Sequence, residues 1–168
     1  MSKHEIQPDA RLEALRPFVG KWHTEGERLV GSFGPAAKLR AVEVFEWLEG
    51  GHFLVHHLSG FFDKEPAGCI EIVGRGAEEN DFKARTFYSD GDAQEWRLAL
   101  REKDTWTLQG KWRDRQGATL QVRNHITFED LGNTLVSEWS YSSDGQSWKP
   151  FLRSRGTKAL PLPDTSIG

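Results

Sequence analysis

Glu46 and His57 are the side chains best spaced for acid/base chemistry, because they lie on either side of Gly50-Gly51. If these glycines form a tight turn, Glu46 pairs with Val55 and His57 pairs with Val44, so the carboxylate and the imidazole share one face of a hairpin. We predict that this face points inward. Such a pair in a dry cavity is an acid/base pair, an anchor for a ligand's polar group, or an ordinary buried hydrogen bond.

The second face of the same hairpin is also largely apolar. A barrel has only one interior, so the other apolar face must be covered from outside. We expect it to form a homodimer interface, with the N-terminal helix as the alternative cover. The residues of this predicted interface are Phe45, Trp47, Leu54, His56 and Leu58.

The residue spacing gives little support for a metal site, a disulfide, a dinucleotide-binding loop or a nucleophile elbow. His52 and His56 share a strand face but lie roughly 13 Å apart, too far for two ligands of one zinc ion. Cys69 is the single cysteine, so it forms no internal disulfide framework and is expected to be a small wall residue. The segment 74–76 lacks the third glycine of a dinucleotide fingerprint, and 145–148 lacks the closing glycine of a nucleophile elbow. We therefore expect neither a metal nor a cofactor.

Length and charge narrow the classes of protein. The 168 residues carry 22 Lys and Arg against 25 Asp and Glu, which argues against a nucleic-acid or membrane-surface partner because both need a basic face. The chain starts without the apolar run of a secretory signal and has no run of eighteen apolar residues. We expect a cytoplasmic protein with a single domain over residues 1–168, since a chain of this size buries one full core.

The elements that must position these side chains are mostly strands. The 7 Trp and 10 Phe, with 17 Gly, suit many strands joined by tight turns. One helix is expected at about 9–19, with Asp9 as its N-cap and Gly20 at its end. After Gly20 the apolar residues recur at every second position, and the connections are too short for helical crossovers. The predicted strands cover about 20–30, 36–48, 52–61, 67–75, 82–89, 93–101, 104–112, 118–129, 133–141 and 147–158.

The alternation of apolar and polar residues along the strands then predicts the fold class. The rows that begin at Trp96, Trp106 and Leu120 each have an apolar face and a polar face, as in an antiparallel sheet curled around its own core. We predict an all-β, up-and-down antiparallel barrel of about ten strands over 20–158, followed by a tail at 159–168. Ten strands exceed the roughly eight that side chains fill, so we expect an internal cavity. A β-sandwich with a filled core is the alternative.

The segment Gly20-Lys21-Trp22 opens the first predicted strand after the helix. This G-x-W pattern resembles the calycins, the superfamily of lipocalins and fatty-acid-binding proteins. The resemblance implies that Trp22 closes one end of the barrel. It also implies that an arginine of the last strand, Arg153 or Arg155, lies across the indole ring, a contact worth about 0.5–2 kcal/mol.

Three further segments, at residues 15–22, 46–54 and the Asp144-Gly145 hairpin, resemble the DUF1579 family. This is a bacterial family of uncharacterised calycin-like proteins that are related in shape to the nitrobindins. The resemblance covers roughly residues 10–158 and implies the same barrel.

Nitrobindins bind haem through a histidine on the last strand. The corresponding position here is Phe151, and no histidine occurs in residues 126–168. Because phenylalanine has no nitrogen to offer the iron, the resemblance does not carry haem binding to this chain.

We interpret the chain as a protein that binds a small apolar or aromatic ligand in its barrel. The donors expected from His57 and Arg153 favour a neutral or anionic molecule. The alternative is a cofactor-free isomerase, cyclase or hydrolase with His57 and Glu46 as acid and base, and a third interpretation is a solid barrel that acts through its dimer face. The residues predicted to contact the ligand are Glu46, His57, Trp96, Trp106, Asn124, Trp139, Tyr141, Phe151 and Arg153.

Overall fold

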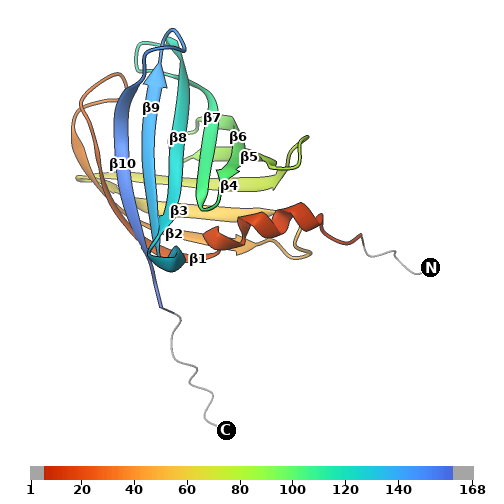
Figure 1. Cartoon of the computed structure of the whole chain (residues 1–168). Helices are drawn as coiled ribbons and strands as arrows, with labels where there is room; N and C mark the ends of the chain where they lie inside the picture. The colour runs from red at the N-terminus through yellow and green to blue at the C-terminus, as the bar shows by residue number, and fades with distance from the viewer. Residues whose placement is uncertain (1–5, 161–168) are drawn as a thin grey trace.

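Ten antiparallel strands pair in chain order, and the first strand also pairs with the last, so the sheet closes on itself (Figure 1). The computed structural model describes residues 6–160, and most of the predicted tail lies outside them. The predicted all-β barrel of about ten strands is therefore confirmed. The strands are β1 (Gly20–Arg28), β2 (Ala37–Trp47), β3 (Leu54–Phe62), β4 (Glu65–Arg75), β5 (Asp81–Tyr88), β6 (Ala93–Glu102), β7 (Thr105–Arg113), β8 (Thr119–Glu129), β9 (Thr134–Ser142) and β10 (Lys149–Lys158).

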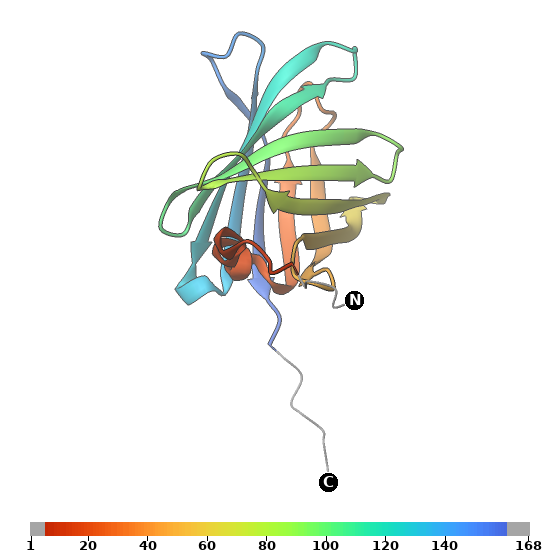
Figure 2. The ribbon, with the colours of Figure 1, turned by 90° about the vertical axis from the view of Figure 1, so that its right-hand side faces the viewer.

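The predicted N-terminal helix is present as η1 (Ala10–Phe18), a 3-10 helix whose N-cap Asp9 accepts a hydrogen bond from the Arg11 amide. A 3-10 helix has three residues per turn, so Leu12, Leu15 and Phe18 fall on one face, and all three are buried. Figure 2 shows η1 lying across the lower end of the barrel. The helix therefore closes this end, which we call the helix end.

Phe18 is the centre of the seal at the helix end. Its ring lies 5.6 Å from Phe45, 5.2 Å from Trp106 and 4.9 Å from Phe128, measured between ring centroids. These edge-on and tilted ring contacts stabilise the packing beyond the contribution of buried apolar area alone. The seal joins β2, β7 and β8 to the helix, so the floor of the barrel is an aromatic layer.

Trp22 also closes the helix end, but its cationic neighbour differs from the one expected. Its indole is fully buried, and its N–H donates to the Phe18 carbonyl at 2.9 Å. The ammonium of Lys158 lies 4.8 Å from the ring centroid. The register pairs Trp22 with Lys158 directly, whereas Arg153 and Arg155 are exposed on the outer face. The expectation that either arginine covers Trp22 is therefore wrong.

The β2–β3 hairpin has the predicted register but the opposite orientation. Glu46 pairs with Val55 and Val44 with His57, as expected. Glu46 and His57 are nevertheless exposed on the outside of the barrel. The cause lies in β1, where the inward Trp22 pairs with Glu43 and thereby fixes which side of β2 faces the interior.

The same correction applies to the predicted dimer interface. Its residues belong to the inward side of the hairpin: Phe45, Leu54 and His56 are buried, and Leu58 lines the interior. Trp47 is half-buried and packs against the core. Four of the five side chains therefore face the interior and not the outer surface that the prediction assigned to a second copy. Large apolar side chains exposed on the outer face of this part of the sheet are instead Phe53, Phe61, Ile70, Ile72 and Phe87.

No helix within residues 6–160 is long and apolar enough to cross a membrane.

Candidate functional site

The barrel encloses a cavity of about 630 Å³, so the expected hollow interior is confirmed and both the β-sandwich and the solid barrel are wrong. Leu15 and Phe18 of η1 form its floor. The opposite end, which we call the mouth, is formed by the loops at 29–36, 63–64, 89–92, 114–118 and 143–148. Most of the wall is apolar, and it includes Leu39, Phe45, Leu54, Val73, Leu98, Leu108, Ile126, Trp139 and Phe151.

Phe33, on the loop between β1 and β2, narrows the mouth. Its ring stacks on Phe151 at 4.3 Å and lies 5.5 Å from both Trp112 and Tyr141. Backbone hydrogen bonds between Gly31 and Gly34 hold the loop in a tight turn. The alternation rules that locate strand residues do not apply to a loop, so sequence reasoning missed Phe33.

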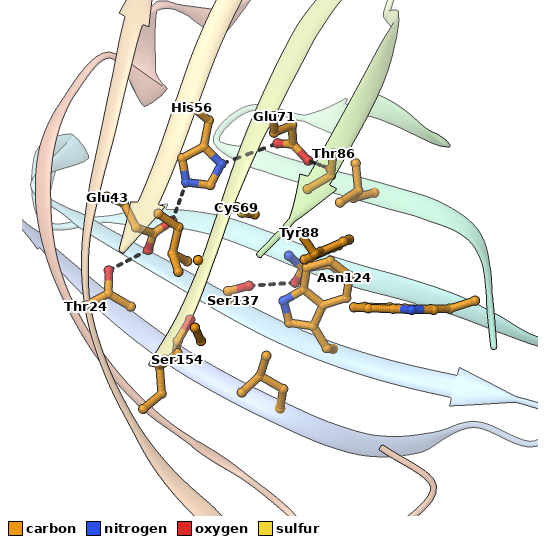
Figure 3. A pocket seen from close by; sticks show the side chains of 18 of the residues that line it. Thr24, Glu43, His56, Cys69, Glu71, Thr86, Tyr88, Asn124, Ser137 and Ser154 are labelled. Carbon is orange, nitrogen blue, oxygen red and sulfur yellow. Dashed lines mark hydrogen bonds and ion pairs between the residues drawn. The ribbon is translucent and has the colours of Figure 1, made fainter. Parts of the chain in front are cut away.

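A cluster of one imidazole and two carboxylates forms the polar part of the wall (Figure 3). The His56 Nε2 atom lies 2.8 Å from Glu43 Oε2, and His56 Nδ1 lies 3.5 Å from Glu71 Oε1. Each carboxylate accepts a hydrogen bond through its other oxygen. The Thr24 hydroxyl donates to Glu43 Oε1 and the Thr86 hydroxyl donates to Glu71 Oε2, both at 2.6 Å. We call these five residues the Glu–His–Glu cluster.

Strand register explains how the Glu–His–Glu cluster forms. His56, Glu71 and Thr86 pair directly across β3, β4 and β5, so they form one row on the inner face. Glu43 lies diagonally across β2 from His56, which pairs directly with Phe45. The imidazole stacks on the Phe45 ring at 3.9 Å with an angle of 4° between the planes. Side chains of the two neighbouring strands, Phe45 and Glu43 on β2 and Glu71 on β4, thus contact the imidazole.

Burial and ion pairing act in opposite directions on His56. Burial alone would lower its pKa, but the hydrogen bond to Glu43 and the interaction with Glu71 outweigh it and raise the pKa to about 9. Burial raises the pKa of Glu43, yet its contacts with His56 and Thr24 are stronger and leave that pKa below the usual value. Imidazolium and carboxylate are therefore the stable forms of this pair at neutral pH.

Two further groups add polarity to the cavity wall. The Ser137 hydroxyl donates to the Asn124 side-chain oxygen at 2.8 Å. Cys69 lies beside the Glu–His–Glu cluster, and burial together with the negative charges of Glu71 and Glu43 raises the pKa of its thiol to about 12. The thiol is therefore a weak nucleophile, as expected for a wall residue.

The structure divides the sequence-predicted site residues into three groups. Asn124, Trp139 and Phe151 line the cavity. Trp96 and Trp106 are buried in the core behind it, and Tyr141 packs against Phe33 and Phe151. Glu46, His57 and Arg153 lie on the outer face and take no part in the site.

Sequence reasoning also missed the two carboxylates of the Glu–His–Glu cluster. A signal for them exists, because Glu43 interrupts the apolar row that contains Ala41 and Phe45, and Glu71 stands in the row between Cys69 and Val73. An acidic residue in an inward row is informative only once the inward row is known. Since both faces of the hairpin are apolar, the sequence does not decide which row that is.

Among residues 6–160, no group of three His, Cys, Asp or Glu side chains is arranged to hold a metal ion.

Comparisons with known proteins agree on the fold. A family model described as "Protein of unknown function (DUF1579)" matches residues 7–158. The crystal structure of Rv2717c from M. tuberculosis is similar with a TM-score of 0.67 and 15% identity, covering 92% of this chain and 100% of that one. The S-type phycobiliprotein lyase CPES from Guillardia theta is similar with a TM-score of 0.61 and 12% identity, covering 89% and 93%. Among curated proteins, none matches this chain.

Proposed function

Because the chain belongs to the DUF1579 family, whose function is unknown, we propose a function from the cavity itself: this calycin-like barrel binds a small, largely apolar or aromatic molecule in its interior. The apolar part of the ligand lies against the wall that includes Trp112, Trp139 and Phe151. Its polar end faces the Glu–His–Glu cluster.

The observation that supports this proposal is the cavity of about 630 Å³, whose largely apolar inner wall carries the Glu–His–Glu cluster. Small-molecule sites typically have about 300–1,000 Å³ and a few placed polar groups. A barrel that served only as a rigid body would gain stability by filling this space, since empty volume costs packing energy. The rigid seal of η1 and the narrowed mouth leave the space available to a molecule of moderate size.

Binding is favoured over acid/base catalysis by the state of His56. Its pKa of about 9 keeps the imidazole protonated at neutral pH, so it has no lone pair with which to take a proton from a substrate. His57 and Glu46, the acid and base of the alternative enzyme interpretation, are outside the barrel. The likeness to a phycobiliprotein lyase at 12% identity concerns the fold and does not shift this balance.

Haem does not fit this wall. The position that the nitrobindin resemblance assigns to the axial histidine holds Phe151, whose ring stacks on Phe33. His56 faces the cavity from another strand, but its Nε2 is hydrogen-bonded to Glu43 and its Nδ1 faces Glu71 at 3.5 Å. To bind iron, His56 would have to give up a proton that the two carboxylates stabilise, since its pKa is raised to about 9.

A neutral aromatic probe, N-phenyl-1-naphthylamine, tests the proposal. We expect its fluorescence to rise on binding to the purified protein. The variant Cys69→Phe puts a ring into the cavity and should weaken binding at least tenfold. The matched variant Ile70→Phe adds a similar ring at the next position, on the outer face, and should bind within about twofold of wild type. Leu58→Phe provides a second cavity-filling variant should Cys69→Phe fold poorly.

Equal binding by Cys69→Phe and Ile70→Phe would overturn the proposal, because the probe would then bind outside the barrel. Native mass spectrometry of the protein from its own host gives an independent test. A bound small molecule that is lost in Cys69→Phe supports the proposal, and a cavity that is consistently empty argues against it.

A further inference from the structure

The Glu–His–Glu cluster carries a net negative charge in either protonation state of its imidazole. Glu43 and Glu71 are both acidic, whereas His56 contributes at most one positive charge. Thr24 and Thr86 donate hydrogen bonds but bring no charge. Burial makes an uncompensated charge costly, so the interior favours a ligand that supplies the missing positive charge.

Apart from His56, basic side chains on the cavity wall are confined to the mouth. These are Arg28 and Arg113, at the ends of β1 and β7, and Arg115 in the loop after β7. Four carboxylates line the same end of the cavity, from Glu65, Asp90, Asp92 and Asp114. Three arginines and four carboxylates share the mouth, so these side chains bring no net positive formal charge to the cavity. An anionic ligand would meet repulsion at the inner wall.

Glu71 has the less satisfied carboxylate of the two. Both oxygens of Glu43 accept short hydrogen bonds, one from Thr24 at 2.6 Å and one from His56 at 2.8 Å. In Glu71, Oε2 accepts from Thr86 at 2.6 Å, while Oε1 has only the 3.5 Å approach of His56 Nδ1. Across residues 6–160 that buried Nδ1 atom has no hydrogen-bond partner either. Glu71 Oε1 is therefore the carboxylate oxygen of the cluster with the weakest contact to the protein, and Glu71 lines the cavity.

We propose that the ligand carries a basic nitrogen, and that its ammonium group binds Glu71 Oε1 on the inner wall while its apolar body occupies the aromatic part of the cavity. The inference rests on the proposed binding function and specifies the ligand class. It differs from the neutral or anionic molecule expected from the sequence, because Arg153 and His57, the donors on which that expectation depended, are on the outer face. The rings of Tyr88 and Trp112, stacked at 5.0 Å, line the same cavity and suit a cation through their faces.

Three probes that share one ring system test the ligand class: 2-naphthylmethylamine, 2-naphthylmethanol and 2-naphthoate, each competing with bound N-phenyl-1-naphthylamine at pH 7. We expect the amine to bind at least tenfold more tightly than the alcohol and the carboxylate to bind most weakly. In Glu71→Gln the amine should lose at least tenfold in affinity, while the alcohol changes less than threefold. Glu46→Gln removes a carboxylate from the outer face and should change none of the three.

The outcomes separate the two proposals. If the carboxylate or the alcohol binds as tightly as the amine, or if Glu71→Gln weakens all three probes equally, the ligand is not a cation and this inference fails while the cavity-binding function stands. If none of the probes, including N-phenyl-1-naphthylamine, is sensitive to Cys69→Phe, the binding function itself fails. Circular dichroism and thermal unfolding of Glu71→Gln establish that the variant is folded. Glu71→Asp, which keeps the charge, should retain the preference for the amine if the fold is intact.

Discussion

The imidazole of His56 and the carboxylate of Glu43 lie 2.8 Å apart inside the barrel, although thirteen residues separate them in the chain. They meet because β2 and β3 pair in a register that places Phe45 opposite His56 and leaves Glu43 on its diagonal. Thr24 of β1 and Glu71 of β4 complete the contacts from the two flanking strands. A buried ion pair of this kind places charged groups on an otherwise largely apolar inner wall.

Removal of one partner of this pair should destabilise the fold. Glu43→Gln keeps the side-chain shape but replaces a charged acceptor, so His56 loses its closest counter-ion. We expect a loss of about 1–3 kcal/mol in the free energy of unfolding, measured with urea at pH 6.5. Glu46→Gln, at an exposed position of the same strand, should stay within about 0.5 kcal/mol of wild type. Equal effects of the two variants would show that the buried pair adds nothing to stability.

The stability of the folded state should also depend on pH through His56. Its pKa is about 9 in the folded protein and near 6.5 when unfolded, so its stabilising contribution is complete below pH 6.5 and is lost as the pH rises through 9. The lowered pKa of Glu43 acts at the other end: its contribution is present above its ordinary pKa of 4.5 and is lost as the pH falls. The pair therefore stabilises most between about pH 4.5 and 6.5.

Urea unfolding at several pH values measures this dependence. Between pH 6.5 and 9.5, wild type should lose on the order of 1–3 kcal/mol more than His56→Gln, since each pKa unit corresponds to about 1.4 kcal/mol. The nearby Cys69 and Tyr88 are present in both proteins, so their own titration largely cancels in the difference. Parallel pH profiles for the two proteins would contradict the raised pKa of His56.

Lys158 should stabilise the helix end through Trp22. Lys158→Met keeps the alkyl chain but removes the ammonium group that lies over the indole, and we expect a loss of about 0.5–1 kcal/mol on chemical unfolding. Arg153→Met removes a cation from the outer face of the same strand and should be neutral within about 0.5 kcal/mol. A larger effect for Arg153→Met than for Lys158→Met would indicate that Arg153 contacts Trp22, as the calycin resemblance implies.

Cys69 should react slowly in the native protein. A thiol with a pKa of about 12 in place of 9.0 has roughly a thousandfold less thiolate at pH 8, and thiolate is the reactive form. Alkylation by iodoacetamide, followed by mass spectrometry, should be slow in buffer and complete within minutes in 6 M guanidinium. Because Cys69 is the single cysteine, the measurement has no background from other thiols. Native alkylation at the rate of the unfolded chain would contradict the burial of this wall position.

Much of the fold is determined by local patterns that the sequence displays directly. Period-two alternation and the spacing of turn glycines predict ten antiparallel strands with bounds close to those observed, because the alternation of side chains is a property of each strand alone. The N-cap at Asp9 and the apolar residues at every third position predict the helix in the same way. Closure and an internal hollow follow from the number of strands.

The inward face of the β2–β3 hairpin, and with it the site, is decided only by the tertiary structure. Both faces of that hairpin are apolar, so alternation leaves two orientations equally acceptable, and the choice depends on the pairing of Trp22 with Glu43 across a loop of eight residues between β1 and β2. The register of β10 likewise puts Lys158, rather than an arginine, over Trp22. A shift of one residue moves every side chain of a strand to the other face. The residues thus determine that a hollow barrel forms, whereas the long-range strand pairings determine which carboxylates and which imidazole face its interior.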